Sequence, residues 1–115
     1  MIRQNNPNGA VTITGNVYGD IAGTATSNCF GVKGMVARSI RDGLYHLLRK
    51  ESMRKGVSVE FHEDNSITID LHIMVDTGVN LYAVGESIIS EVRYVVNKCT
   101  DTEVRAINVY IDSMV

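Results

Sequence analysis

Two alternating segments followed by a long amphipathic segment, together spanning residues 56–98, constrain the fold of this 115-residue chain more than any other feature. Apolar residues alternate with polar ones over 57–62 and again over 66–76, which predicts two half-buried strands. Over 80–98 the apolar spacing becomes helical, which predicts a helix that covers the hairpin. The apolar residues are Val57, Val59, Phe61, Ile67, Ile69, Leu71, Ile73 and Val75 in the strands, and Leu81, Val84, Ile88, Val92 and Val95 in the helix.

The turn between these two strands follows from parity. Inward residues are odd-numbered on both strands, so directly paired residues must sum to an even number, which excludes a two-residue loop. A three-residue loop over 63–65, with Asn65 left-handed, satisfies this condition and places Glu60 opposite Thr68. The next even register would place Glu60 opposite Asp70, and like charges in direct opposition are unfavourable. We therefore expect the three-residue loop.

The remaining segments predict an alternation of strands and helices. We expect strands over 10–14 and 30–37, a helix over 16–28 capped by Thr14, a short helix over 39–50 and a final strand over 104–112. The helix over 16–28 should turn Val17, Ile21 and Ala25 inward. Glycines at 15, 19 and 23 would allow another backbone to approach, or are simply tolerated. This order predicts an α+β fold, a two-layer sandwich of a mixed β-sheet with helices mainly on one face.

Length and charge define the broad class of the protein. A chain of this size buries about two thirds of its unfolded surface, which suits one domain over residues 1–115. Eleven basic and thirteen acidic residues give a net charge of −2, so nothing attracts the whole chain to nucleic acid or anionic lipid. The start lacks a secretory pattern, and no apolar run reaches the roughly 18 residues of a membrane span. We expect a cytoplasmic protein without direct membrane insertion, with Cys29 and Cys99 reduced and structural.

Patterns of catalytic or metal-binding residues are missing from the sequence. The chain has no GxSxG, CxxC, HxH or HExxH spacing, and its glycines form neither a GxGxxG motif nor a phosphate-binding loop. In the expected register, His72 lies six positions beyond the partner of His62, about 20 Å away at about 3.3 Å per residue. Two imidazoles at that separation cannot share a zinc ion. We therefore expect no enzymatic activity, metal or cofactor.

A local excess of basic residues is the main candidate for partner binding. Six basic and two acidic residues between positions 38 and 55 give a local charge of +4. This segment is either a solvated helix face or a contact for an acidic protein, an anionic lipid surface or RNA. Aromatic residues do not interleave with it, which disfavours single-stranded nucleic acid. The polar side of the sheet is a second candidate. The candidate partner-binding residues are Arg38, Arg41, Arg49, Lys50, Arg54, Lys55, Met74 and Tyr110.

A series of segments in a fixed order carries a resemblance to a known family. These are AVTIT, DIAGTAT, CFGVKGM, RDGLYHLLRK with RKGVSVEF, ITIDLHIMVDTGVNL and INVYID, which together cover nearly the whole chain. The chain resembles the alkaline shock protein twenty-three, or Gls-type, envelope stress response family of Gram-positive bacteria.

This resemblance implies a non-enzymatic interaction or scaffold protein of cell-envelope homeostasis that self-associates as a homo-oligomer. It also implies that protein partners hold it near the membrane, with a membrane-anchored protein and a fatty-acid-kinase-like protein as candidates. The alternative function is an RNA- or anionic-lipid-binding protein that uses the local basic segment.

Overall fold

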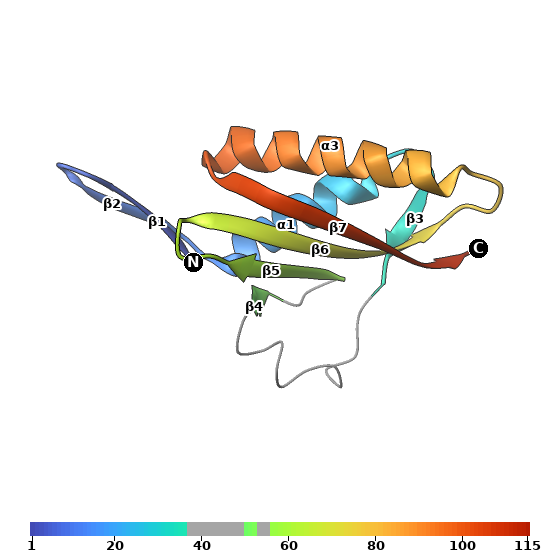
Figure 1. Ribbon diagram of the computed structural model, residues 1–115, viewed down its shortest axis with the longest axis horizontal. Coiled ribbons are helices and arrows are strands. Elements are labelled where there is room, and N and C mark those ends of the chain that lie inside the picture. Colours follow the sequence, from blue (N-terminus) through green and yellow to red (C-terminus); the bar gives the residue numbers. More distant parts are fainter. Residues whose placement is uncertain (37–49, 53–55) are drawn as a thin grey trace.

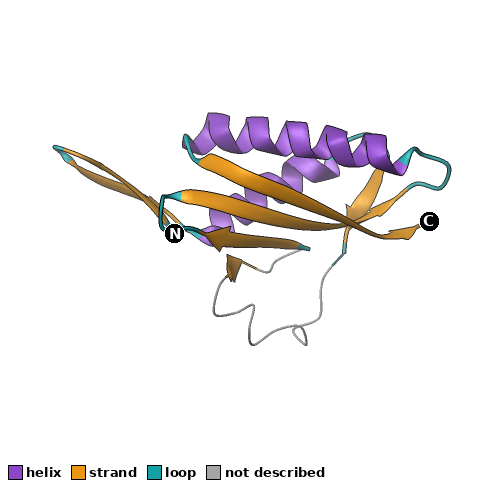
Figure 2. Ribbon diagram, in the orientation of Figure 1, coloured by secondary structure: helices purple, strands orange, loops and turns teal. Residues whose placement is uncertain are grey.

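The computed structural model describes residues 1–36, 50–52 and 56–115. The short helix predicted over 39–50 lies outside the described residues, apart from Lys50, which begins a strand. The described chain has helices on one side of a larger sheet and a separate two-stranded hairpin (Figures 1 and 2). In chain order its elements are β1 (Ile2–Asn6), β2 (Gly9–Ile13), α1 (Gly15–Ser27), β3 (Val32–Met35), β4 (Lys50–Ser52), β5 (Val57–Phe61), β6 (Ser66–Val75), α3 (Leu81–Thr100) and β7 (Glu103–Met114).

Strand β6 is the centre of the larger sheet. Strand β7 pairs with it in parallel from one end to the other, whereas β5 pairs antiparallel with its first half and β3 with its second half. Since β7 runs along one edge of β6, β5 and β3 follow one another along the other edge. Strand β4 extends the sheet beyond β5. The predicted α+β sandwich with a mixed sheet is therefore confirmed.

The predicted turn of the β5–β6 hairpin is also confirmed. Glu60 lies opposite Thr68, and Asn65 is left-handed with a φ of 64°. The carboxylate Oδ1 of Asp64 accepts hydrogen bonds from the backbone N–H of Ser66 at 3.1 Å and from its hydroxyl at 2.6 Å. These bonds hold the turn closed in the register that places the odd-numbered apolar residues on one face.

The core lies between this apolar face and α3. Asn80 caps the helix with its side chain, which accepts a hydrogen bond from the backbone N–H of Ala83 at 2.9 Å. Leu81 and Val95, both predicted to face inward, are exposed and half-buried respectively. The buried stripe instead follows the i, i+4 row along the helix, and its members are Val84, Ile88, Val92, Val96 and Thr100.

Helix α1 turns a different face to the core than the apolar spacing predicts. Val17 is 43% exposed and Ile21 is half-buried, whereas Tyr18 and Ala22 are completely buried. The hydroxyl of Tyr18 lies 2.6 Å from Oγ1 of Thr102, so the buried phenol has a polar partner. The predicted inward position Val17 is therefore wrong, because a hydrogen-bonded tyrosine takes its place in the core. Ile21 packs against the core while partly buried, and Ala25 is buried as predicted.

The N-cap of α1 and one of its glycines also differ from expectation. Thr14 occupies the N-cap position, but its side chain makes no capping hydrogen bond. A Cβ added at Gly23 would meet the side chain of Val57 at 3.6 Å, which is an ordinary contact. Close approach of another backbone therefore does not explain this glycine.

The N-terminal hairpin is absent from the sequence-based prediction. Strand β2 was expected, but its partner β1 has the sequence IRQNN, which shows no alternation of apolar residues. The hairpin extends away from the rest of the molecule (Figure 1). Its base is attached by the buried side chain of Ile2 and by a hydrogen bond from Nε2 of Gln4 to the Thr100 carbonyl at 2.8 Å.

Candidate partner-binding face of the sheet

The face of the larger sheet that points away from α1 and α3 carries polar side chains from β5, β6 and β7. It is termed the outer face here. Side chains alternate between the two faces of a strand, so the odd-numbered apolar residues of β6 fill the core while the even-numbered ones lie outside. The outer face comprises Glu60, Thr68, Asp70, His72, Met74, Asn108, Tyr110 and Asp112.

His72, Tyr110 and Asp112 form a cluster on the outer face. His72 is directly opposite Tyr110 in the parallel register, and their rings stack with centroids 4.6 Å apart and planes 12° apart. Nδ1 of His72 lies 3.1 Å from Oδ2 of Asp112, at a point where the register shifts between β6 and β7. The His72 side chain is only 10% exposed, so the stack and the carboxylate fix both its position and that of the Tyr110 ring.

The two predicted residues of the sheet, Met74 and Tyr110, are both neighbours of this histidine, one along β6 and the other across on β7. Met74 follows His72 on the same face of β6 and is half-buried, whereas Tyr110 is 46% exposed. The structure therefore brings them together as one partly apolar area within a polar face. A tyrosine held by ring stacking loses little side-chain freedom on binding, and this favours its use as a contact residue.

Most other polar side chains of the outer face are engaged with one another. Nδ2 of Asn108 donates to Oδ1 of Asp70 at 2.9 Å, across the directly paired positions of β6 and β7. Nε2 of His62, at the end of β5, lies 2.7 Å from Oγ1 of Thr68. These contacts satisfy polar groups within the sheet, so Tyr110 and Met74 remain the features that stand out on this face.

Of the six basic residues in the predicted set, the structure describes the backbone of one, Lys50. Arg38, Arg41, Arg49, Arg54 and Lys55 lie outside the described residues. Lys50 begins β4, where its backbone position is directly opposite Glu60 of β5. The backbone of Lys50 therefore belongs to the same sheet as Met74 and Tyr110.

Three features of common site types are not found among the described residues, beside the outer-face cluster or elsewhere. Within residues 1–36, 50–52 and 56–115, no hydroxyl or thiol hydrogen-bonds His72. No three His, Cys, Asp or Glu side chains of that same part gather into a possible metal site. Nor does any described helix have the length and apolar character needed to cross a membrane.

The His72–Asp112 pair is the feature of this face that sequence reasoning missed. Nothing in the sequence indicated that β7 lies beside β6 in parallel. The register shift between Ile73 and Met74 brings Asp112 to the histidine. That irregularity arises from the pairing of the two strands and not from the pattern within either one.

Comparisons with known proteins agree with the sequence resemblance. The model of the alkaline shock protein twenty-three family, described as having a cell envelope-related function, matches residues 3–115. Among similar proteins, uncharacterized protein YloU of Bacillus subtilis is 34% identical over 107 residues, covering 92% of this chain and 88% of the relative. Uncharacterized protein Spy1614 of Streptococcus pyogenes is 28% identical, covering 98% and 93%. No solved structure matches the chain significantly.

Proposed function

Since the chain belongs to the alkaline shock protein twenty-three family, with its cell envelope-related function, we propose that it is a non-enzymatic interaction or scaffold protein of the envelope stress response. In this proposal it works in the cytoplasm and reaches the membrane through a protein partner. A membrane-anchored protein and a fatty-acid-kinase-like protein are the candidates, and the chain itself forms a homo-oligomer.

The observation that supports docking is the Tyr110 ring on the outer face. Its stacking on His72 and the proximity of Met74 provide a rigid aromatic and thioether surface surrounded by polar groups. Partner-binding sites commonly have this composition, with a central aromatic anchor and a polar rim. The polar side chains around it are held by their own hydrogen bonds, so binding there requires little reordering.

The basic segment suggests the charge of the partner. Its local charge of +4 contrasts with the net charge of −2 of the whole chain. Strand β4, which contains Lys50, lies beside β5 in the sheet. An acidic protein partner would gain electrostatic attraction from this segment, and opposite charges of this kind mainly accelerate and orient association.

The test replaces Arg49, Lys50, Arg54 and Lys55 with glutamine and measures recovery of crosslinked protein partners from the native host. We expect recovery to fall, and recovery with the unaltered chain to weaken as salt rises, because exposed charges are screened beyond about 8 Å at physiological ionic strength. The matched control replaces two arginines and two lysines that are exposed elsewhere, namely Arg3, Lys33, Lys98 and Arg105. Equal recovery by the two variants would contradict a role for the segment.

Further assays distinguish the alternative function, binding of RNA or anionic lipid, from binding of a protein partner. RNA binding would show a steep dependence on salt as counterions are released, and nuclease would abolish it. Lipid binding would appear as sedimentation of the purified chain with anionic vesicles but not with neutral ones. Recovery that resists nuclease and depends on the basic segment supports the protein partner.

A further inference from the structure

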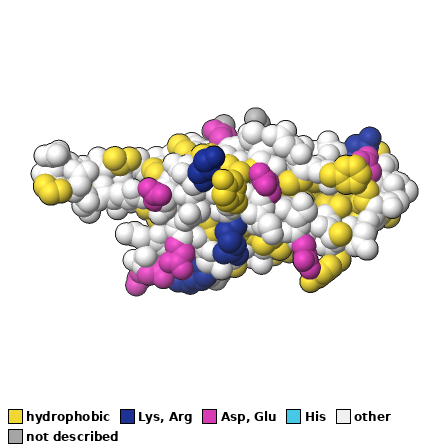
Figure 3. All heavy atoms as spheres, turned by 90° about the horizontal axis from the view of Figure 1, so that it is seen from above, with side chains coloured by type: hydrophobic (Ala, Val, Ile, Leu, Met, Phe, Trp, Pro, Cys, Tyr) yellow, Lys and Arg dark blue, Asp and Glu magenta, His cyan; other side chains and the backbone are white. Residues whose placement is uncertain are grey.

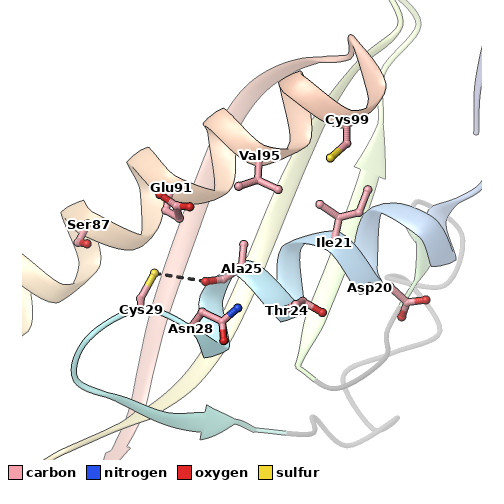
Figure 4. Close-up of a pocket in the computed structure, with 10 residues that line it drawn as sticks. All are labelled: Asp20, Ile21, Thr24, Ala25, Asn28, Cys29, Ser87, Glu91, Val95 and Cys99. Atoms are coloured by element: carbon pink, nitrogen blue, oxygen red, sulfur yellow. Dashed lines mark hydrogen bonds between the residues drawn. The ribbon is translucent and has the colours of Figure 1, made fainter.

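The two helices leave a groove between them, on the side of the sheet opposite the outer face. Helices α1 and α3 pack against one another, and a groove of about 740 Å³ lies between them. Its apolar lining includes Ile21 and Ala25 from α1 and Val95 from α3 (Figure 4). It exists because several side chains along the contact, such as Ala25 and Ser87, are too small to fill the space.

The groove has an acidic character. Glu91 contributes an exposed carboxylate, and no Lys, Arg or His belongs to the lining among the described residues. The last turn of α1, at the end of the groove near Cys29, carries no basic side chain, so the negative end of its dipole is uncompensated. Burial raises the pKa of the Cys29 thiol, and the charge of Glu91 adds to that increase. The groove therefore favours a positively charged occupant.

An apolar extension continues the groove along α3. A pocket of about 370 Å³ shares Ser87 with the groove and is lined further by Phe30, Val79 and Ala83. The Phe30 side chain is 88% exposed. Seen from above, hydrophobic side chains are exposed over the half of the molecule in which α3 begins (Figure 3). Groove and pocket together follow the 20 residues of α3, about 30 Å at 1.5 Å per residue.

We propose that this groove binds an amphipathic helix of a partner protein, with apolar residues facing Ile21, Ala25 and Val95 and Lys or Arg facing Glu91. An apolar floor of helical length with charged margins is the standard receptor for such a helix, whose anchors recur at i, i+3, i+4 and i+7. The helix layer and the outer face lie on opposite sides of the sheet. Two different partners can therefore be bound at the same time, which is what a scaffold requires.

The two cysteines provide a site-specific readout. Cys29 and Cys99 are the only cysteines of the chain, and both line the groove, toward opposite ends (Figure 4). The probe is a synthetic helical peptide of about 18 residues with leucine at the anchor positions and lysine beside them. We expect it to slow alkylation of both thiols in the native chain. The same peptide with glutamate in place of lysine should give no protection.

Charge reversal on α3 tests the assignment further. Glu91→Lys should weaken protection by the lysine peptide about tenfold, because an attraction becomes a repulsion at an exposed margin. Glu86→Lys is the matched control, since Glu86 is an exposed residue of the same helix outside the groove lining, and it should leave protection unchanged. Circular dichroism of both variants verifies that the fold is retained.

Several outcomes would overturn the assignment. Equal protection by the lysine and glutamate peptides would refute the charge preference, and peptide binding without thiol protection would place the helix elsewhere. Protection that rises with protein concentration in the absence of peptide would assign the groove to a second copy of the chain. Substituting Tyr110 or the basic segment should not alter protection, so failure here is distinguishable from failure of the outer-face proposal.

Discussion

Replacing Tyr18 with phenylalanine tests the least expected contact of the core. The Tyr18 ring is completely buried, and its hydroxyl lies 2.6 Å from Oγ1 of Thr102, in the turn between α3 and β7. Phenylalanine keeps the ring and removes only the hydroxyl, so packing is retained while one buried hydrogen bond is lost. After the change, Thr102 keeps a long contact to the carbonyl of Thr100 at 3.4 Å.

The expected cost follows from that geometry. A typical hydrogen bond contributes about 1 kcal/mol net, and a buried polar group left without its partner costs about 1–3 kcal/mol. Because Thr102 retains a weaker partner, we expect Tyr18→Phe to lower the free energy of unfolding by about 1–2 kcal/mol. Tyr110→Phe removes a hydroxyl from an exposed tyrosine and should change it by less than about 0.5 kcal/mol.

A double-mutant cycle measures the contact itself. Urea denaturation of the native chain, Tyr18→Phe, Thr102→Val and the double variant gives four free energies of unfolding. We expect a coupling energy of about 1 kcal/mol between the two positions. Additive effects, with a coupling energy below about 0.3 kcal/mol, would refute the hydrogen bond that joins α1 to the turn before β7.

Three further predictions concern the core, the hairpin turn and ionisation of the buried phenol. Leu71→Ala should lower the free energy of unfolding by about 2–5 kcal/mol in denaturant melts because Leu71 is fully buried. Thr68→Ala, on the outer face, should lower it far less, and equal losses would show that the strand faces are assigned wrongly. Hydrogen bonds from Ser66, with a smaller contribution from Arg105, lower the pKa of Asp64 from 3.8 to about 2. Its stabilising effect should thus be complete above pH 3.8 and be lost as pH falls toward 2, and an NMR titration midpoint near 4 would disprove the turn contacts. Burial raises the pKa of Tyr18 above 10.0, so its contribution to stability should be complete below pH 10 and decline above it; an identical decline in Tyr18→Phe would show that other groups are responsible.

The hairpin and its register could be predicted because every required signal is local. Alternation identifies the two strands, parity restricts the loop length, and the charges of Glu60 and Asp70 select one register. Each of these depends on residues within about twenty positions, so no tertiary information is needed. The same reasoning identified α3, although its buried row is rotated toward Val96.

The parts that could not be predicted depend on long-range packing. Periodicity treats Val17 as a better core residue than Tyr18, but the hydroxyl of Thr102, 84 positions away, makes the tyrosine the buried one. Strand β1 is a strand because β2 pairs with it, not because of its own pattern. The cluster of His72 with Asp112 likewise requires the parallel placement of β7.

The predicted site likewise has one part that the structure describes and one part that it does not. Met74 and Tyr110 were assigned to one face from alternation alone, and the structure places both next to His72, along β6 and across on β7. The basic segment was identified from its charge, and a charge count is independent of the structure around it. Its partner-binding role therefore stays a prediction, as do the contributions of Arg38 and Arg41.

A photo-crosslinking residue placed at Tyr110 in the native host tests whether the outer face docks a protein partner. Tyr94, an exposed tyrosine of α3, provides the control position. We expect a discrete protein adduct from position 110 that resists nuclease, is weaker or missing at position 94 and falls when the basic segment carries the four glutamines. Adducts of equal yield from both positions, or none from position 110, would contradict it.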